Sequence, residues 1–244
     1  MNRSWIGLAF VALVAAVVGI QFFFGANPYG GALETREIAT RGLAQALVAR
    51  HPGKRVIILS NPFIKRPETD RRIVAMEEAG VRGLRSGLEG KLTIDDVVYP
   101  ELRPEARENP RAVAIDTETT TPLSYLVATD AFDRAALEHP DAEILISLIG
   151  LPIELDKCEV WKKEGPPSFA LLLPDLRMLG SAAAVAAAVK SGKLTAIVLA
   201  RPNAGADEKA GPDFKAEFER RYVLVTSDNV DELVRQSPEL LQSP

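Results

Sequence analysis

The sequence predicts an α/β fold: a doubly wound, mostly parallel sheet with helices on both faces, preceded by one N-terminal transmembrane helix. Three observations lead to this prediction. Short apolar segments alternate with segments of helical periodicity along most of the chain. The apolar segments are continuously hydrophobic, which is typical of parallel strands covered on both faces. Residues 5–24 carry no charged side chain over a length that can cross a bilayer.

The N-terminal segment WIGLAFVALVAAVVGIQFFF, residues 5–24, would form a helix about 30 Å long, which matches the hydrocarbon core of a membrane. Trp5 at one end and three phenylalanines at the other suit the two membrane interfaces. Phe23 and Phe24 stand where a signal peptidase needs small residues, so we expect an uncleaved anchor. Arg3 precedes the segment, and the charges of Glu34, Arg36 and Glu37 after it roughly cancel, so the N terminus should be cytoplasmic.

The expected organisation follows from this anchor. The chain would sit in the inner (cytoplasmic) membrane with a single pass, the lipid bilayer being its first partner, and its body would lie in the periplasm or another extracytoplasmic space. The expected parts are a short cytoplasmic N terminus (1–4), the anchor (5–24), a linker (25–32), an α/β domain (33–235) and a tail (236–244).

Composition excludes several classes of function. The chain has 244 residues, a formal net charge of −4 and 47% hydrophobic residues, which fits one globular domain or two small lobes. The absence of a basic excess argues against a nucleic-acid partner. Cys158 is the only cysteine, so no intramolecular disulfide and no cysteine-based zinc cluster can form. His51 and His139 each precede a proline where a helix should end, so we expect neither a histidine triad nor a metal site.

The first half of the body contains two segments with apolar residues at helical spacing and three runs of branched apolar residues. Thr69 is the candidate N-cap of the second helix. Glycines at 80, 83 and 87 weaken that helix in isolation but permit its close approach to a sheet. The elements expected, in order, are a helix over 33–50, a strand over 56–60, a helix over 69–86 and strands over 92–100 and 112–116.

The second half continues the alternation. Thr129 is the candidate cap of its first helix. SAAAVAAAVKSG has strong helix propensity because it is rich in alanine, and Gly192 should end it. The elements expected, in order, are a helix over 130–138, strands over 143–150 and 168–175, a helix over 181–192, strands over 194–202 and 221–229 and a short helix over 229–234.

Three stretches share a helix–turn–strand or strand–turn pattern: AFDRAALEHPDAEILISLIG at 131–150, VAAAVKSGKLTAIVLARP at 185–202 and RYVLVTSDNVDEL at 221–233. A fourth, GLRSGLEGKLTIDDVVYPEL at 83–102, is fainter. In these stretches the chain resembles the type I periplasmic-binding-protein superfamily, the solute receptors related to bacterial sugar and amino-acid binding proteins. The resemblance covers under half of the chain. The body is short for a two-lobed receptor. The resemblance therefore implies that the chain is a divergent or single-lobe member of this superfamily.

Polar residues follow several of the predicted strands. Open parallel sheets bind ligands outside the carboxyl ends of their strands, where the strand order reverses. Asparagine and aspartate there supply donors and acceptors for a polar solute, and an arginine can clamp a carboxylate. Each of these residues also has an ordinary structural role in a turn. The candidate ligand-binding residues are Ser60, Asn61, Phe63, Asp116, Ser147, Asp175, Arg201 and Asn203.

The sequence contains no G-x-G-x-x-G after the first strand, no Walker A motif, no G-x-S-x-G and no H-E-x-x-H, so we expect no cofactor and no catalytic site. WKKEGPP at 161–167 should be an exposed connection. Two functions remain open: binding or sensing of a small polar solute, and an accessory subunit that docks onto a membrane complex without a ligand. An enzyme that uses Asp116, Glu118 or Asp175 as an acid or base lacks any specific motif.

Overall fold

The computed structural model describes residues 30–202, 204 and 209–242, and within them the chain forms one six-stranded sheet. The strand order is β2-β1-β3-β4-β5-β6; the pairs from β2 to β5 are parallel, and β6 is antiparallel to β5. The mostly parallel sheet is therefore confirmed, and the described residues form one sheet rather than two lobes. The strands are β1 (Arg55–Leu59), β2 (Thr93–Val98), β3 (Ile144–Ser147), β4 (Ser168–Leu172), β5 (Leu194–Ala200) and β6 (Tyr222–Val225).

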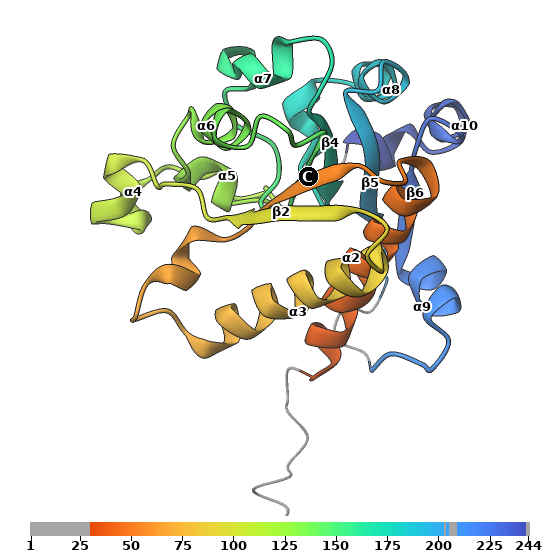
Figure 1. Cartoon of the computed structure of the whole chain (residues 1–244), viewed down its shortest axis with the longest axis horizontal. Coiled ribbons are helices and arrows are strands. Elements are labelled where there is room, and N and C mark those ends of the chain that lie inside the picture. The colour runs from red at the N-terminus through yellow and green to blue at the C-terminus, as the bar shows by residue number, and fades with distance from the viewer. Residues whose placement is uncertain (1–29, 203, 205–208, 243–244) are drawn as a thin grey trace, which may run out of the picture.

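Helices cover both faces of the sheet, as Figure 1 shows: α2, α3 and α9 lie on one face and the remaining α-helices on the other. The α-helices are α2 (Gly30–Arg50), α3 (Arg71–Leu88), α4 (Pro104–Glu108), α5 (Leu123–Leu126), α6 (Ala131–Glu138), α7 (Glu159–Lys162), α8 (Ala182–Lys190), α9 (Phe214–Arg221) and α10 (Val230–Gln236). The described part of the chain also contains five short 3-10 helices: η1 (Pro62–Lys65), η2 (Pro110–Ala112), η3 (Leu155–Lys157), η4 (Leu176–Leu179) and η5 (Pro238–Gln242).

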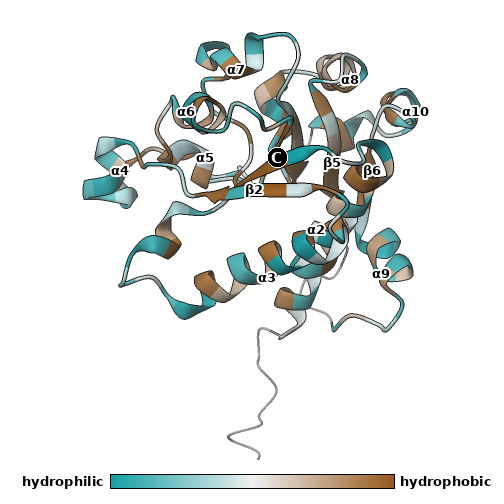
Figure 2. Cartoon of the chain, in the orientation of Figure 1, coloured by the Kyte–Doolittle hydropathy of each residue, from teal (hydrophilic) through white to brown (hydrophobic). Residues whose placement is uncertain are grey.

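The core is divided by the sheet into two hydrophobic layers. Ile57 packs with α6 and α8 on one face, whereas its neighbour Ile58 packs with Leu43 of α2 and Leu84 of α3 on the other. All of these side chains are fully buried. Successive residues of a strand point to opposite faces, so a strand covered on both sides must be apolar at every position. Figure 2 shows hydrophobic colour along β5, whereas the edge strand β2, which has the sequence TIDDVV, is of mixed colour.

Two helix N-caps differ from the prediction. Asp70, not Thr69, caps α3, because its carboxylate accepts the backbone N–H of Arg72 at 2.8 Å. The Thr69 hydroxyl instead donates to the carbonyl of Phe63. Asp130, not Thr129, occupies the N-cap position of α6. The cap of α8 is Ser181, and Gly192 lies just beyond its end with a φ of 77°.

The strand predicted over 112–116 is wrong. Residues Pro110–Ala112 form η2, and the chain after them is irregular. The apolar residues Val113 and Ile115 pack instead on a small cluster with Leu102 and Leu126, outside the sheet. The alternating pattern of AVAID therefore has another cause than strand pairing. One side of the segment is buried against this satellite cluster, which lies beneath a long connection.

The glycines of α3 permit a close approach, but to a helix rather than to the sheet. A Cβ on Gly83 would overlap Thr40 Oγ1 and the carbonyl oxygen of Glu37, and one on Gly87 would lie 2.5 Å from the carbonyl oxygen of Arg41. These three contacts all belong to α2. The two helices therefore pack with their backbones unusually close together.

The predicted anchor at 5–24 lies outside the described residues. Among the helices that are described, none combines the length and the apolarity needed to cross a bilayer. The helix α2 begins at Gly30, inside the segment predicted to be a linker. At the other end, η5 extends past residue 235 and buries Leu241 completely in the core.

Candidate functional site

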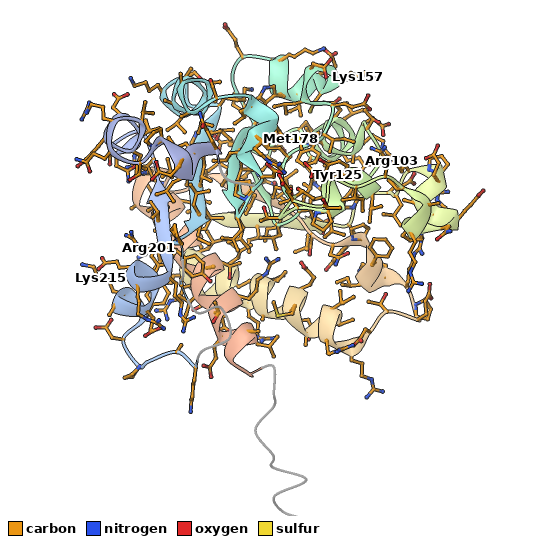
Figure 3. The ribbon with its side chains drawn as sticks, turned by 180° about the vertical axis from the view of Figure 1, so that it is seen from behind. Arg103, Tyr125, Lys157, Met178, Arg201 and Lys215 are labelled. Atoms are coloured by element: carbon orange, nitrogen blue, oxygen red, sulfur yellow. The ribbon has the colours of Figure 1, made fainter. Side chains whose placement is uncertain are left out.

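The candidate site lies at the carboxyl edge of β1, β3 and β4. From β1 the chain passes to β2 on one side, and from β3 onward it builds the sheet on the other side. The order therefore reverses between β1 and β3, which is where open α/β sheets leave a crevice for ligands. Figure 3 shows the side chains from behind, with Tyr125 of α5 and Met178 of η4 labelled.

The two polar residues after β1 are used by the fold. Ser60 is fully buried, and its hydroxyl donates to Glu77 Oε2 of α3 at 2.9 Å. Glu77 in turn accepts from Arg36 of α2 at 3.2 Å, so the three side chains tie β1 to both helices. Asn61 caps η1, since its Oδ1 accepts the backbone N–H of Phe63 at 3.0 Å. Both predicted binding residues thus carry structural hydrogen bonds.

Ser147, at the end of β3, is also fully buried. Its hydroxyl donates to the carbonyl of Gly150 at 2.6 Å and accepts the backbone N–H of Ile149 at 3.3 Å. Gly150 has a φ of 87°, and a Cβ there would lie 2.7 Å from Cβ of Thr121. The close contact places the loop that contains Thr121 directly on this edge of the sheet.

Asp175, after β4, is the centre of a charged cluster. Its carboxylate is fully buried and accepts Arg177 Nε at 3.0 Å and Nη2 at 2.7 Å. The same guanidinium contacts Asp116 at 3.0 Å and Glu118 at 3.2 Å. We call these four residues the Arg177 cluster. The structure therefore brings together two of the predicted site residues, Asp116 and Asp175, through an arginine that the sequence analysis did not identify.

The electrostatics of the cluster follow from this geometry. Burial alone would raise the pKa of Asp175, but hydrogen bonds from Arg177 and Thr119 keep the pKa below its usual value. The hydrogen bond to Asp175 raises the pKa of Arg177. Burial, with the nearby charges of Asp116 and Asp175, raises the pKa of the Tyr125 hydroxyl. Asp116 and Glu118 remain open to solvent, with side chains 39% and 76% exposed.

The other predicted residues lie apart from this cluster. Phe63 is half-buried in the satellite cluster, with the guanidinium of Arg66 5.0 Å from its ring centre. Arg201 is exposed at the end of β5 and donates from Nε to the carbonyl of Glu219 in α9 at 2.8 Å. This bond ties Arg201 to the connection between β5 and β6. Asn203 lies outside the described residues.

Tyr125 and Arg177 were missed by sequence reasoning. Tyr125 follows a polar loop rather than a strand, so the strand-end rule did not select it. Arg177 had a signal: it stands two residues after Asp175, the same spacing as Arg72 after Asp70. In both pairs the aspartate caps a helix and accepts the backbone N–H of the arginine.

The structure gives no catalytic role to Cys158. The thiol is fully buried, and burial raises its pKa to about 12. Its sulfur lies 3.6 Å from Asp133 Oδ1. Across the described ranges, no group of three or more histidine, cysteine, aspartate or glutamate side chains could hold a metal ion.

No protein-family model and no curated protein sequence matches the chain. Solved structures do match. A substrate-binding protein of a sugar ABC transport system from Bordetella parapertussis is 11% identical with a TM-score of 0.50, and the match covers 86% of this chain and 60% of that one. A carbohydrate transporter from Acidothermus cellulolyticus in complex with myo-inositol is 12% identical with a TM-score of 0.47, and the match covers 84% and 62%.

The chain thus spans about three fifths of the length of these structures. At such low identity the likeness is one of fold. The predicted resemblance to the type I periplasmic-binding-protein superfamily is confirmed at that level, since the matched structure from Bordetella parapertussis is a substrate-binding protein of a sugar ABC transport system.

Proposed function

We propose that the chain is a non-catalytic extracytoplasmic domain, held at the inner membrane by residues 5–24, that binds a small polar solute at the carboxyl edge of β1, β3 and β4. One observation carries the proposal. The Arg177 cluster lies at this edge, and its Asp116 and Glu118 carboxylates are open to solvent. The structure from Bordetella parapertussis that shares this fold is a substrate-binding protein of a sugar transport system, which supports binding of a solute without its chemical transformation.

The chemistry of the cluster suits a hydroxyl-bearing solute. Arg177 can donate only, and ionised carboxylates can accept only. A sugar or polyol hydroxyl does both, so it can insert between Arg177 and Asp116, whose contact of 3.0 Å lies at the exposed side of the cluster. A single lobe contributes only part of the surface that two lobes would close around a ligand. We therefore expect weak binding, with a Kd of roughly a millimolar.

The experiment is a thermal-shift measurement by intrinsic fluorescence on the full chain in a mild detergent, with a panel of sugars, polyols and amino acids. We expect at least one solute to raise the unfolding temperature, because a ligand that binds only the native state stabilises it. The double substitution Asp116→Asn with Glu118→Gln should abolish the shift. Asp130→Asn, another exposed aspartate paired with an arginine, is the matched control. A panel without any shift, or a shift that survives the double substitution, would refute solute binding at this edge.

A second function, an accessory subunit of a membrane complex, is favoured by a different observation. Ser60, Ser147 and Asp175 are completely buried, and each is hydrogen-bonded within its own chain. Because these polar side chains at the edge of the sheet already have hydrogen-bond partners in the chain, no ligand is required to satisfy them. If chemical cross-linking in membranes captures the same partner protein reproducibly while no solute shifts the unfolding temperature, this function replaces the first.

A further inference from the structure

A cavity lies at the edge of the sheet opposite to the Arg177 cluster. It has a volume of about 820 Å³ and is lined where strands begin: Lys54 precedes β1, Glu143 precedes β3 and Lys193 precedes β5. His51, at the end of α2, and the segment from Trp161 to Pro166 complete the wall. The connection WKKEGPP is therefore part of a concave surface, not only an exposed link. The volume falls within the range of about 300–1,000 Å³ typical of small-molecule sites.

The lining is positive although the whole chain is not. Four lysines (Lys54, Lys162, Lys163 and Lys193) and two glutamates (Glu143 and Glu164) line the cavity, whereas the chain has a formal net charge of −4. One lysine is neutralised inside the lining, since Lys54 pairs with Glu143. Lys162 pairs with Glu159, which is not part of the wall, at 2.8 Å. With Glu159 counted, four ammonium groups and three carboxylates lie at the cavity, an excess of one positive charge.

Lys193 is the lysine of the lining whose ammonium group is held in place by hydrogen bonds to the backbone. Its ammonium donates to the carbonyl of Val160 at 3.2 Å and to that of Lys163, which holds it at the end of α7. A lysine ammonium has three donors, and these two carbonyls use two of them. Burial, together with the charge of Lys163, lowers the pKa of Lys193. An anion beside it would offset that burial and repulsion.

The cavity also has an aromatic and apolar wall. Trp161 lines it, and its ring makes an edge contact with the buried Phe169, with the ring centres 5.3 Å apart. Pro166, Ala187 and Ala188 add apolar surface. A flat ring can bury area against such a wall while a charged group reaches the lysines. A ligand that has both a flat ring and a negatively charged group would contact the apolar wall and the lysines at the same time.

We propose that this amino-edge cavity is a second binding site, specific for a small organic anion that carries a flat ring, of the size of a nucleoside monophosphate. The site is separate from the Arg177 cluster, which lies at the carboxyl edge. The 21-residue helix α2 ends beside the cavity, about 30 Å along its axis from Gly30. A segment that anchors the chain before Gly30 would thus leave the cavity accessible.

The test uses the full chain in detergent micelles and follows the indole N–H resonances of its two tryptophans, Trp5 and Trp161, with Trp161→Phe as the assignment variant. The probes are adenosine monophosphate, adenosine and inorganic phosphate. We expect saturable movement of the Trp161 resonance with the monophosphate, and binding at least tenfold weaker for adenosine and for phosphate. The affinity for the monophosphate should fall as salt is raised, because screening weakens charge pairing.

Two lysine variants distinguish binding in the cavity from non-specific attraction of the anion to surface lysines. Lys163→Gln should weaken binding of the monophosphate about three- to tenfold, since it removes one exposed charge from the lining without touching the core. Lys190→Gln is the matched control, because Lys190 is an exposed lysine on α8 that pairs with Asp231 outside the lining. Asp116→Asn should leave the affinity unchanged, which keeps this site distinct from the carboxyl edge. No movement of Trp161, equal binding of adenosine, or equal effects of the two lysine variants would overturn the proposal.

Discussion

Asp70 and Asp175 form a natural comparison at the scale of single residues. Each caps a helix and accepts both the backbone and the side chain of the arginine two positions later. They differ in burial: the Asp175 side chain is 0% exposed, whereas that of Asp70 is 41% exposed. The same local motif is therefore a surface cap at one site and an ion pair with a buried carboxylate at the other.

We expect Arg177→Ala to lower the free energy of unfolding by about 2–3 kcal/mol, because it leaves the buried Asp175 carboxylate without its charged partner. Arg72→Ala, the matched control at the exposed pair, should cost less than about 1 kcal/mol. Urea denaturation at pH 7 measures both. Equal losses would mean that burial of the carboxylate does not matter.

The pH dependence of this difference has a defined sign. The folded-state pKa of Asp175 is lowered, so its contribution to stability is present above its unfolded pKa of about 3.9 and is lost as the pH falls through the folded value. In Arg177→Ala, burial without a partner favours the protonated carboxyl. The gap in stability between the native chain and Arg177→Ala should therefore shrink between pH 7 and pH 3, as measured by urea denaturation across that range. A gap that is constant with pH would contradict this role of Asp175.

Cys158 should be unreactive in the folded chain. With a pKa of about 12 and no exposed surface, only about one thiol in 10,000 is ionised at pH 8, and the thiolate is the reacting form. We expect negligible modification by a thiol reagent in buffer and one reactive thiol per chain in denaturant. Rapid native labelling would show that the loop around Cys158 opens.

At the scale of elements, the contact between α2 and α3 depends on the missing side chains of two glycines. Replacing an exposed helical glycine with alanine normally stabilises by roughly 0.5–1 kcal/mol. At Gly83 the new methyl group would overlap Thr40 and Glu37 of α2, so the helices would have to separate.

We therefore expect Gly83→Ala, and likewise Gly87→Ala, to destabilise by about 2 kcal/mol or more. Ser86→Ala, at an exposed position of the same helix, controls for helix propensity and should be neutral or slightly stabilising. Thermal denaturation followed by circular dichroism distinguishes the two outcomes. Stabilisation by Gly83→Ala would mean that the helices are less closely packed than described.

At the scale of the whole molecule, both hydrophobic layers share one sheet, so neither can unfold while the other stays intact. The layer with Ile57 and the layer with Ile58 use alternate residues of the same strands. Loss of strand pairing would expose both layers together.

We expect residues 30–244 to unfold in one cooperative transition. Trp161, the single tryptophan of that fragment, packs on one layer, whereas circular dichroism reports on the helices of both. Midpoints in denaturant from the two probes should coincide. Separate midpoints would indicate two independent units, as in a two-lobed receptor.

The sequence by itself determined the fold class, because periodicity and continuous apolar strands depend only on local order along the chain. It also determined the order of most elements, the absence of a disulfide and the resemblance to solute receptors. It failed at 112–116, where an alternating pattern was satisfied by a small cluster and not by strand pairing.

The tertiary structure decided which polar groups remain available. Ser60 and Ser147 stand at strand ends as predicted, but their partners Glu77 and Gly150 become neighbours only after folding. The Arg177 cluster likewise joins residues 116 and 118 to residues 175 and 177, which are far apart in the chain. Burial and long-range pairing depend on which elements meet in space, and no local pattern encodes them. The sequence could therefore place side chains at the correct edge of the sheet, but only the folded structure showed which of them the fold had already used.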